Sequence, residues 1–465
     1  MPVSAGRDEW QVIVAGAGNA GLCAGIAALQ AGATAVAVVD AAPEKLRGGN
    51  SSLTKSMRFS WRDSAHLARL LRTSDTGLVE ELVAGRSEYA NEQYLDDWLR
   101  VSGSQVNTAL IASIIGRSAS AITWMYESGQ RWEPRKNPLP GDVPVVLEGG
   151  GQGLQDRNFE QFEQLGGRVF HDSALTDIEV TVDGMYHIKG VGPAFPATCA
   201  ALVLASGGFE GNERMRERYL GESWRDVKLR GVPFNKGVPL MAAIAIGADK
   251  AGNWAKCHAT PQGILLPNHM LPGQMQESHA LARYAYPRGI VVNRNGLRFF
   301  DEAADYGNLT YVTLGQKILE QPGKVAFQIF DKAVLDADLL PKSYLEDPAS
   351  VVAASIEDGA RRLFIDVENL VETVRAHPRV GTPPYLFVPV VCGLTFTYGG
   401  LSVSPNAEVY GGGRPMIGLY AVGEIVGGLY DQGYPAGTGL TAGAVLGRAA
   451  GASAATYAMK IGELL

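Results

Sequence analysis

The chain begins with short apolar runs separated by glycine-rich breaks. Residues 11–15 are predicted to form a buried strand, residues 16–18 a tight turn, residues 22–31 an alanine-rich helix and residues 35–40 a second strand. This succession is typical of a βαβ unit, in which a helix connects two parallel strands. Residues 202–206 have the apolar composition of another buried parallel strand. The pattern predicts an α/β fold with a Rossmann-like sheet.

The pattern changes in the second half of the chain. From residue 256 to residue 384, prolines interrupt polar helical segments, and residues 289–296 carry the Asn-Gly signal of a β-hairpin. Glycines and small residues return from residue 393 onward. We therefore expect an α+β domain inserted into a discontinuous main domain. The expected bounds are 1–254 for the first part of the main domain, 255–382 for the insertion and 383–465 for the second part of the main domain.

Composition and charge narrow the classes of function. With 465 residues, of which 46% are hydrophobic, the chain has enough apolar material for two domains. Its 41 basic and 48 acidic residues give a formal charge of −7, and the basic residues are dispersed. Nucleic acid and anionic membrane surfaces are therefore poor candidate partners, and we expect a small-molecule substrate.

The cysteines and the N-terminus also exclude some possibilities. The four cysteines, at positions 23, 199, 257 and 392, lack the spacing of haem attachment, iron–sulfur or other metal sites. Any redox cofactor is therefore expected to be organic. Residues 1–10 show no basic region followed by an apolar run, and no stretch of about eighteen apolar residues occurs. We expect a cytoplasmic protein without a membrane span.

A dinucleotide-binding fingerprint lies between the first predicted strand and helix. Gly16, Gly18 and Gly21 have the spacing GxGxxG, and Asp40 ends the next strand nineteen positions beyond Gly21. The first glycine permits the turn, the second lets a pyrophosphate approach the backbone and the third lets the helix approach the strand. The Asp40 carboxylate can bind a ribose hydroxyl. This context predicts a bound NAD or FAD.

Three further segments favour FAD. Residues 47–54 (RGGNSSLT) offer hydroxyls, an amide and flexible backbone to a longer cofactor, and Gly423-Glu424 place a carboxylate where a strand can return to the same sheet. Residues 434–441 (YPAGTGLT) open a small-residue helix whose N-terminal N–H groups can face an electron-rich ring. The predicted FAD-binding residues are Gly16, Gly18, Asn19, Gly21, Asp40, Gly48, Gly49, Asn50, Ser51, Thr54, Ser206, Gly207, Gly423, Glu424, Gly439, Leu440 and Thr441.

Several motifs, in order along the whole chain, carry a family resemblance. They are GGNS at 48–51, LVLASGGF at 202–209, GIVVNRNGLRFFDE at 289–302, GGL at 399–401 and GLYAVGE at 418–424. With them the chain resembles the fumarate reductase and succinate dehydrogenase flavoprotein superfamily. Four further segments most resemble its tricarballylate dehydrogenase-like branch: RGGNS at 47–51, KCHA at 256–259, TFTYGG at 395–400 and GYPAGTGLTAG at 433–443. The resemblance implies an FAD-binding domain of the GR2 type and a mobile capping domain, with the substrate between them at the flavin face.

The chain departs from that superfamily at residues that face the substrate. Tyr306 and Tyr434 stand where fumarate reductases carry arginines, and Phe396 replaces a histidine, whereas His258 matches the other substrate-facing histidine. Tyrosine offers one neutral hydroxyl in place of a permanent charge, which suits a ketone better than a dicarboxylate. The 3-ketosteroid dehydrogenases of the same superfamily show a similar pair of tyrosines. This resemblance implies that Tyr306 takes the α-proton and Tyr434 polarises the ketone oxygen.

The implied reaction is an FAD-dependent desaturation next to a carbonyl group. The α-proton leaves to a base and the β-hydrogen leaves as hydride to flavin N5, most plausibly from a small cyclic ketone or keto acid. The FAD is expected to be non-covalent because residues 47–52 contain no histidine, and the electron acceptor can be oxygen, a quinone or an electron-transfer flavoprotein. Besides the catalytic residues Tyr306, Tyr434 and His258, the expected substrate contacts are Gly437, Thr438, Phe396 and Arg288.

Alternatives remain open at this stage. The chain can be a tricarballylate or dicarboxylate dehydrogenase, an enoate reductase working in the reverse direction, or a flavin-binding protein without turnover. Four other tyrosines compete for the role of base, and three arginines can hold a substrate carboxylate. These residues are Tyr284, Tyr286, Tyr398 and Tyr430, and Arg58, Arg283 and Arg288.

Overall fold

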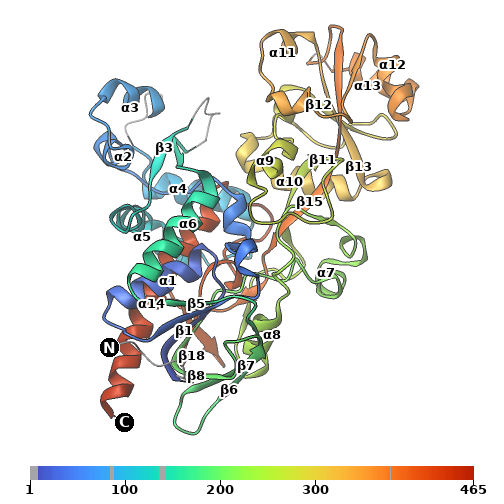
Figure 1. The fold of residues 1–465 in the computed structure, drawn as a ribbon. Coiled ribbons are helices and arrows are strands. Elements are labelled where there is room, and N and C mark those ends of the chain that lie inside the picture. The colour runs from blue at the N-terminus through green and yellow to red at the C-terminus, as the bar shows by residue number, and fades with distance from the viewer. Residues whose placement is uncertain (1–8, 84–87, 136–142, 378, 465) are drawn as a thin grey trace.

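The fold is seen in a computed structural model that describes residues 9–83, 88–135, 143–377 and 379–464. The expectation about the N-terminal segment falls on residues 1–8, which lie outside this described part. The chain forms two sheets, with the larger in the lower half of Figure 1 and the smaller toward the upper right. One long strand, coloured orange, runs from the smaller sheet toward the larger one.

The larger, eight-stranded sheet carries the predicted βαβ unit. Its strands are β1 (Glu9–Ala15), β2 (Val36–Val39), β5 (Arg168–Phe170), β6 (Ala174–Val180), β7 (Tyr186–Val191), β8 (Ala197–Leu204), β17 (Glu408–Gly411) and β18 (Arg414–Ala421). The central order is β18-β8-β1-β2-β5, and these strands run parallel. The β1 side chains Val12, Ile13 and Val14 are fully buried, as expected for a parallel sheet covered on both faces. The predicted α/β fold with a Rossmann-like sheet is confirmed.

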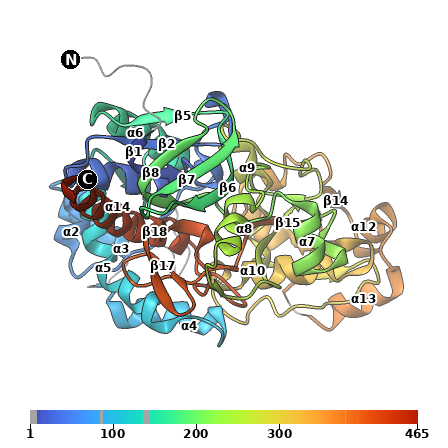
Figure 2. The same cartoon turned by 90° about the horizontal axis from the view of Figure 1, so that it is seen from below.

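Nine helices belong to the same half of the described chain as this sheet. They are α1 (Asn19–Gln30), α2 (Ser64–Leu71), α3 (Thr76–Val83), α4 (Asn91–Ser102), α5 (Thr108–Glu127), α6 (Gly150–Gln164), α7 (Glu213–Leu220), α8 (Val238–Ala245) and α14 (Thr438–Leu464). Of these, α1, α6, α8 and α14 pack against its strands. The first and last of them, α1 and α14, lie side by side in both views (Figures 1 and 2). The N-terminus of α1 directly follows the turn after β1, so the backbone N–H groups of its first turn point toward the carboxyl edge of the sheet.

The smaller, six-stranded sheet lies on the other side of the molecule. Its strands are β9 (Lys228–Leu229), β11 (Cys257–Gly263), β12 (Ile290–Asn293), β13 (Val325–Phe330), β14 (Val351–Ala353) and β15 (Tyr385–Thr397). The helices near it are α9 (Met275–Leu281), α10 (Gly307–Leu319), α11 (Lys332–Asp336), α12 (Ile356–Leu363) and α13 (Val367–Arg375). The path through the sheet is β11-β15-β13-β12, and β9 and β14 also pair with β15. Since β9 and β15 lie outside residues 255–382, the expected domain bounds stay a prediction.

The predicted hairpin at residues 289–296 is correct in its turn and wrong in its strand pairing. Gly296 donates its N–H to the Asn293 carbonyl at 3.0 Å, and Val292 bridges Arg298 across the turn. Strand β12 nevertheless makes its regular ladder with β13, more than thirty residues later. The chain turns away because the Glu302 carboxylate binds the N–H of Val291 at 2.7 Å and pairs with Arg298.

Two absences hold for the described residues. None of the helices that they form is long and apolar enough to cross a membrane. No group of three or more His, Cys, Asp or Glu side chains within them is arranged to hold a metal ion.

Candidate active site

A cavity of about 1260 Å³ extends from the carboxyl edge of the larger sheet to the smaller sheet. Its walls include the turns after β1, β2, β8 and β18, the start of α14, and residues of β11, α10 and β15. Ligands bind at this edge in open α/β sheets, beyond the carboxyl ends of the strands. The volume exceeds the ~300–1,000 Å³ that is typical of a site for one small ligand. The cavity therefore has room for a dinucleotide and a substrate.

The glycine fingerprint lies at one end of the cavity, where Gly16 and Gly18 line it. Gly16 has a φ of +114°, and a Cβ atom there would lie 2.3 Å from the Ala205 carbonyl oxygen. A Cβ atom on Gly21 would lie 2.0 Å from the Gly16 oxygen. Turn, helix and neighbouring strand thus meet so closely that only glycine fits, as the fingerprint requires.

Asp40 lies at the same end, where β2 stops. Its carboxylate accepts the N–H groups of Ala17 and Ala42, each at 2.8 Å, and these bonds fix its orientation beside the turn. Burial raises the pKa of Asp40, while the two N–H groups oppose that shift. Asp40 lines the cavity, where its remaining acceptor capacity suits a ribose hydroxyl.

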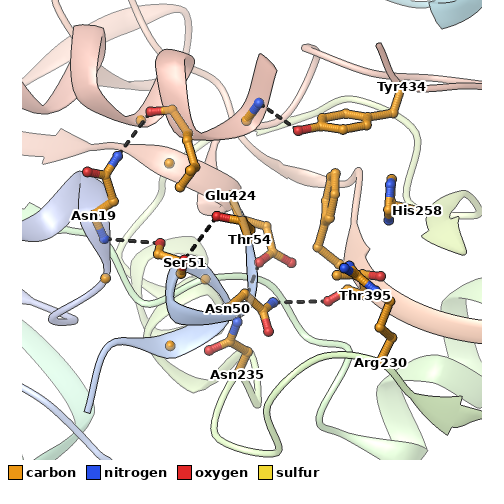
Figure 3. A pocket seen from close by; sticks show the side chains of 18 of the residues that line it. Asn19, Asn50, Ser51, Thr54, Arg230, Asn235, His258, Thr395, Glu424 and Tyr434 are labelled. Carbon is orange, nitrogen blue, oxygen red and sulfur yellow. Dashed lines mark hydrogen bonds between the residues drawn. The ribbon is translucent and has the colours of Figure 1, made fainter. Parts of the chain in front are cut away.

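Hydrogen bonds join the middle segments of the predicted cofactor site. The Asn19 N–H donates to Ser51 Oγ at 3.1 Å, and Asn19 Nδ2 donates to the Leu440 carbonyl at 3.0 Å (Figure 3). The hydroxyl of Ser206, at the end of β8, is buried and has no hydrogen-bond partner among the described residues. A bound cofactor would satisfy this hydroxyl, so the site fits an FAD molecule.

The carboxylates of Glu210 and Glu424 lie together near the middle segments of the predicted cofactor site. Asn235 Nδ2 donates to Glu210 Oε1 at 2.7 Å and to Glu424 Oε2 at 3.4 Å, and Asn50 Nδ2 donates to Glu210 Oε1 at 2.9 Å. The N–H of Thr397 donates to Glu424 Oε1 at 2.9 Å. Burial raises the pKa of both carboxyl groups, and the charge of Glu424 raises that of Glu210 further. Glu424 lines the cavity, where it can accept from the ribityl hydroxyls of FAD.

Three of the residues predicted to face the substrate, His258, Phe396 and Tyr434, meet at the other end of the cavity. His258 and Phe396 are paired in register on β11 and β15, and their rings stack with centroids 4.5 Å apart. The Tyr434 ring stands edge-on to both rings, at 4.8 and 5.1 Å. Its hydroxyl accepts the N–H of Gly439 in the first turn of α14 at 2.9 Å (Figure 3). The other side of His258 is bound, because Nε2 lies 2.9 Å from the Tyr311 hydroxyl.

This end of the site is neutral at the His258 and Tyr434 side chains. Burial, together with the positive charge of Arg230, holds the pKa of His258 well below its usual value. Burial raises the pKa of Tyr434, although the Gly439 N–H opposes that rise. At neutral pH the cavity therefore offers an uncharged imidazole and a phenol that can donate a hydrogen bond.

Most other predicted site residues also line the cavity. Gly437 and Arg288 do so, together with nearly all the cofactor residues. Four packed residues, Gly21, Gly48, Thr438 and Thr441, lie behind the wall. The prediction that Thr438 contacts the substrate is not supported, because its hydroxyl donates to the Pro435 carbonyl at 2.9 Å and is buried.

Tyr306 lies outside the cavity in this structure. Its side chain is 50% exposed, although the neighbouring Gly307 lines the wall. The Tyr306 carbonyl accepts the N–H of Leu309 at the start of α10, and Asp305 pairs with Arg100 of α4 at 3.4 Å. These contacts hold the segment at the surface, and no motif around residue 306 predicts them.

The competing tyrosines differ in their access to the cavity. Tyr284, Tyr398 and Tyr430 line it, whereas Tyr286 donates to the Gly307 carbonyl and stays in the wall. Tyr430 is held by Thr438, at 2.9 Å between the hydroxyl oxygens.

Two of the candidate arginines are committed to the protein. Arg58 donates to the Ala436 carbonyl and the Tyr89 hydroxyl, at 2.9 and 3.0 Å. Arg283 forms a buried ion pair with Asp347 at 2.5 Å. Of the three arginines considered from the sequence, Arg288 alone lines the cavity.

Sequence reasoning missed several residues of the site. Apart from Thr395, which belongs to the segment TFTYGG at 395–400, they lie outside the recognised motifs or beside them, and the residues that they contact are distant in the sequence. These residues are Glu210, Arg230, Asn235, Tyr311 and Thr395. The only available signal was adjacency, since Glu210 follows the GGF motif and Thr395 precedes Phe396.

Comparisons with known proteins identify the family to which the chain belongs. The family described as "FAD binding domain" matches residues 78–440. A fumarate reductase (cytochrome) of Shewanella frigidimarina is 27% identical over 496 residues, which cover 98% of this chain and 79% of that protein. The 4-oxocyclohexanecarboxylate 2-dehydrogenase of Sinomonas cyclohexanicum is 26% identical over 339 residues, covering 61% and 55% of the two chains.

The fold also matches a solved structure. The 3-ketosteroid-Δ4-(5α)-dehydrogenase from Rhodococcus jostii RHA1, in complex with 4-androstene-3,17-dione, superposes with a TM-score of 0.71 at 22% identity. The match covers 97% of this chain and 98% of that one. The expected superfamily and the expected FAD are thereby confirmed. The chain belongs to the FAD binding domain family and is an FAD-dependent oxidoreductase of the fumarate reductase and dehydrogenase group, acting on CH–CH groups.

Proposed function

We propose that the protein is a dehydrogenase that introduces a C=C bond next to the carbonyl group of a small cyclic ketone or keto acid. The observation that carries the proposal is the position of Tyr434. Its hydroxyl lies in the cavity at the N-terminus of α14, beside the neutral His258 and the ring of Phe396. Hydroxyl and N–H donors with aromatic walls suit a carbonyl group on an apolar ring.

Polarisation of the carbonyl is the first task of these residues. While accepting the Gly439 N–H, the Tyr434 hydroxyl can still donate its own proton to a substrate oxygen. The positive end of the α14 dipole favours negative charge on that oxygen as the enolate forms. One donor of this kind stabilises a developing oxyanion by roughly 3 kcal/mol.

Removal of the α-proton is assigned to Tyr306. Because its hydroxyl lies outside the cavity here, this role requires residues 305–307 to move inward when the proposed capping domain, residues 255–382, closes over the substrate. Tyr311 already lines the cavity, but its hydroxyl is engaged with His258 and burial raises its pKa well above the usual value. That environment makes Tyr311 a poor proton acceptor. Bound FAD supplies the acceptor for the hydride that leaves the β-carbon.

The comparisons support a ring ketone. One relative is named for oxidising 4-oxocyclohexanecarboxylate, and the solved structure with the same fold contains a steroid dione. The second candidate, reduction or oxidation of a dicarboxylate, is favoured by the similarity to fumarate reductases. Two carboxylates would need strong charge compensation between the aromatic walls of this cavity, and tyrosines stand where the superfamily's arginines would supply it.

The substrate class can be tested by anaerobic bleaching of the bound flavin. We expect cyclohexanone-type ketones, with or without one carboxylate, to reduce the flavin, and succinate and tricarballylate to leave it oxidised. A protein that is bleached by either polycarboxylate and by none of the ketones is instead a carboxylate dehydrogenase.

We also expect the FAD to be bound without a covalent link. No histidine occurs in residues 47–52, and the cavity holds the cofactor through backbone turns and polar side chains. Acid or heat denaturation followed by centrifugation should release all yellow colour into the supernatant, where chromatography should identify FAD. Colour that stays with the precipitated chain would overturn this expectation. For the electron acceptor, oxygen, a quinone and an electron-transfer flavoprotein are the candidates to compare in turnover assays.

A further inference from the structure

Arg230 is a buried arginine whose charged group faces the cavity. It follows β9, and its main-chain N–H donates to the Leu394 carbonyl at 2.7 Å, which fixes the residue beside β15. The residue is 9% exposed and lines the cavity (Figure 3). Among the residues that the structure describes, no carboxylate pairs with its guanidinium, and Nε is buried without a hydrogen-bond partner. A guanidinium in such a place is costly unless an anion joins it.

A second unpartnered group lies next to it. Thr395 of β15 is 6% exposed, lines the cavity, and its hydroxyl has no hydrogen-bond partner within the described parts of the chain. Thr395 follows Leu394 on β15, and Leu394 pairs with Leu229 of β9 and accepts the main-chain N–H of Arg230, so Thr395 and Arg230 lie at neighbouring positions of adjacent strands. The acidic residues of the cavity wall are Asp40 and Glu424, near the cofactor, and Asp338. Arg230 and Thr395 therefore form a pair of buried hydrogen-bond donors without an acceptor among the described residues.

The position of this pair relates it to Tyr434. His258 lies between Tyr434 and Arg230 in the view of Figure 3, its ring contacts the Tyr434 ring with centroids 4.8 Å apart, and the charge of Arg230 acts on it. All four residues line the same cavity. A substrate lying along this wall would meet a carbonyl-binding group at one end and an anion-binding group at the other.

We propose that Arg230, assisted by the Thr395 hydroxyl, binds the single carboxylate of a cyclic keto acid whose ketone oxygen is bound by Tyr434. This inference rests on the proposed function and narrows its substrate class from ketones to ring keto acids. The planar guanidinium matches a carboxylate in shape and charge, and the hydroxyl adds one more donor. One cation at this position compensates one carboxylate, so the same site is a poor fit for a dicarboxylate.

The test compares two ring ketones of similar size, 4-oxocyclohexane-1-carboxylate and neutral 4-methylcyclohexanone. For Arg230→Gln, we expect anaerobic flavin reduction by the keto acid to lose roughly 10- to 100-fold in kcat/KM, the scale of a lost hydrogen bond to a charged group. Reduction by the neutral ketone should stay unchanged. Arg230→Lys should recover part of the loss, because lysine restores the positive charge but lacks the planar guanidinium that can make two parallel hydrogen bonds. Equal losses for both ketones would overturn the assignment and place Arg230 against the flavin.

Binding of cyclohexanecarboxylate gives a readout that needs no turnover. The spectral change of the bound flavin should report a Kd that Arg230→Gln weakens by roughly 10- to 100-fold. The matched control is Lys342→Gln, which removes an exposed positive charge at the cavity rim and should leave the Kd unchanged. A weakening that follows Lys342 or Arg288→Gln instead would refute the role of Arg230.

Failure of the proposed function and failure of the proposed anion site give different results. If no ketone reduces the flavin but the Kd still depends on Arg230, the proposed function is wrong and the anion site stands. If ketones reduce the flavin while Arg230→Gln changes neither keto-acid kinetics nor the Kd, the anion site is wrong and the function stands. Should Arg230→Gln lose FAD or fail to fold, Thr395→Val removes the second donor without changing the charge. It should weaken carboxylate binding alone, and an unchanged Kd would then reject the site.

Discussion

Replacing Tyr434 by phenylalanine is expected to slow flavin reduction by a ring ketone about 10²- to 10³-fold, the usual cost of removing one oxyanion donor. The variant keeps the ring that packs edge-on against His258 and Phe396 and loses only the hydroxyl. The Gly439 N–H then remains at the helix N-terminus without its present acceptor. Stopped-flow absorbance of the flavin under anaerobic conditions measures the rate directly.

Tyr398→Phe is the matched control for this prediction. Tyr398 also lines the cavity, and its buried hydroxyl has no hydrogen-bond partner among the described residues. The proposed reaction assigns no role to that hydroxyl, so its loss should leave the rate of flavin reduction nearly unchanged. If Tyr398→Phe slows the reaction and Tyr434→Phe does not, the carbonyl is bound elsewhere in the cavity.

Tyr306→Phe should reduce the rate of flavin reduction by at least ~10²-fold, the scale of a general base. Since the Tyr306 side chain is half-exposed, the variant should keep its FAD and its thermal stability. The measurement is single-turnover flavin reduction with saturating ketone. Tyr311→Phe serves as the comparison, because that hydroxyl already lies in the cavity against His258. A large loss in Tyr311→Phe together with a normal rate in Tyr306→Phe would transfer the role of base to Tyr311.

The cofactor loops could be predicted from the sequence because their requirements are local. The Gly16 turn needs a positive φ and space for the Ala205 carbonyl, and only glycine meets both conditions. Asp40 follows because its distance from the fingerprint is set by one helix and one strand. Such spacings can be counted in the sequence itself, and the match to the FAD binding domain family is consistent with them.

The meeting of His258 and Phe396 could be anticipated only through the family resemblance. Their contact depends on the register of β11 and β15, strands separated by more than a hundred residues. A long-range strand pairing also explains why the hairpin prediction was incomplete. Strand β12 forms its ladder with the distant β13 and not with the residues that follow its turn.

The sequence could not predict the residues whose role depends on an unpaired charge or on a neighbouring charge. Arg230 follows β9, a strand of two residues that pairs with β15. The residue propensities of such a short segment do not predict this pairing. Glu210 and Glu424 become neighbours because β8 and β18 are adjacent in the sheet, although 214 positions separate them in the sequence. In each case the decisive property is what lies around the side chain after folding, which a single sequence does not contain.

The most direct test of the central claim is the product of one anaerobic turnover. The holoenzyme, mixed with an excess of 4-oxocyclohexane-1-carboxylate, should lose its oxidised flavin absorbance and yield one equivalent of the ring 2-enone per flavin, identified by mass spectrometry and NMR. In parallel, succinate should leave the flavin oxidised and yield no fumarate. Stoichiometric fumarate from succinate, with no enone from any ring ketone, would contradict the account.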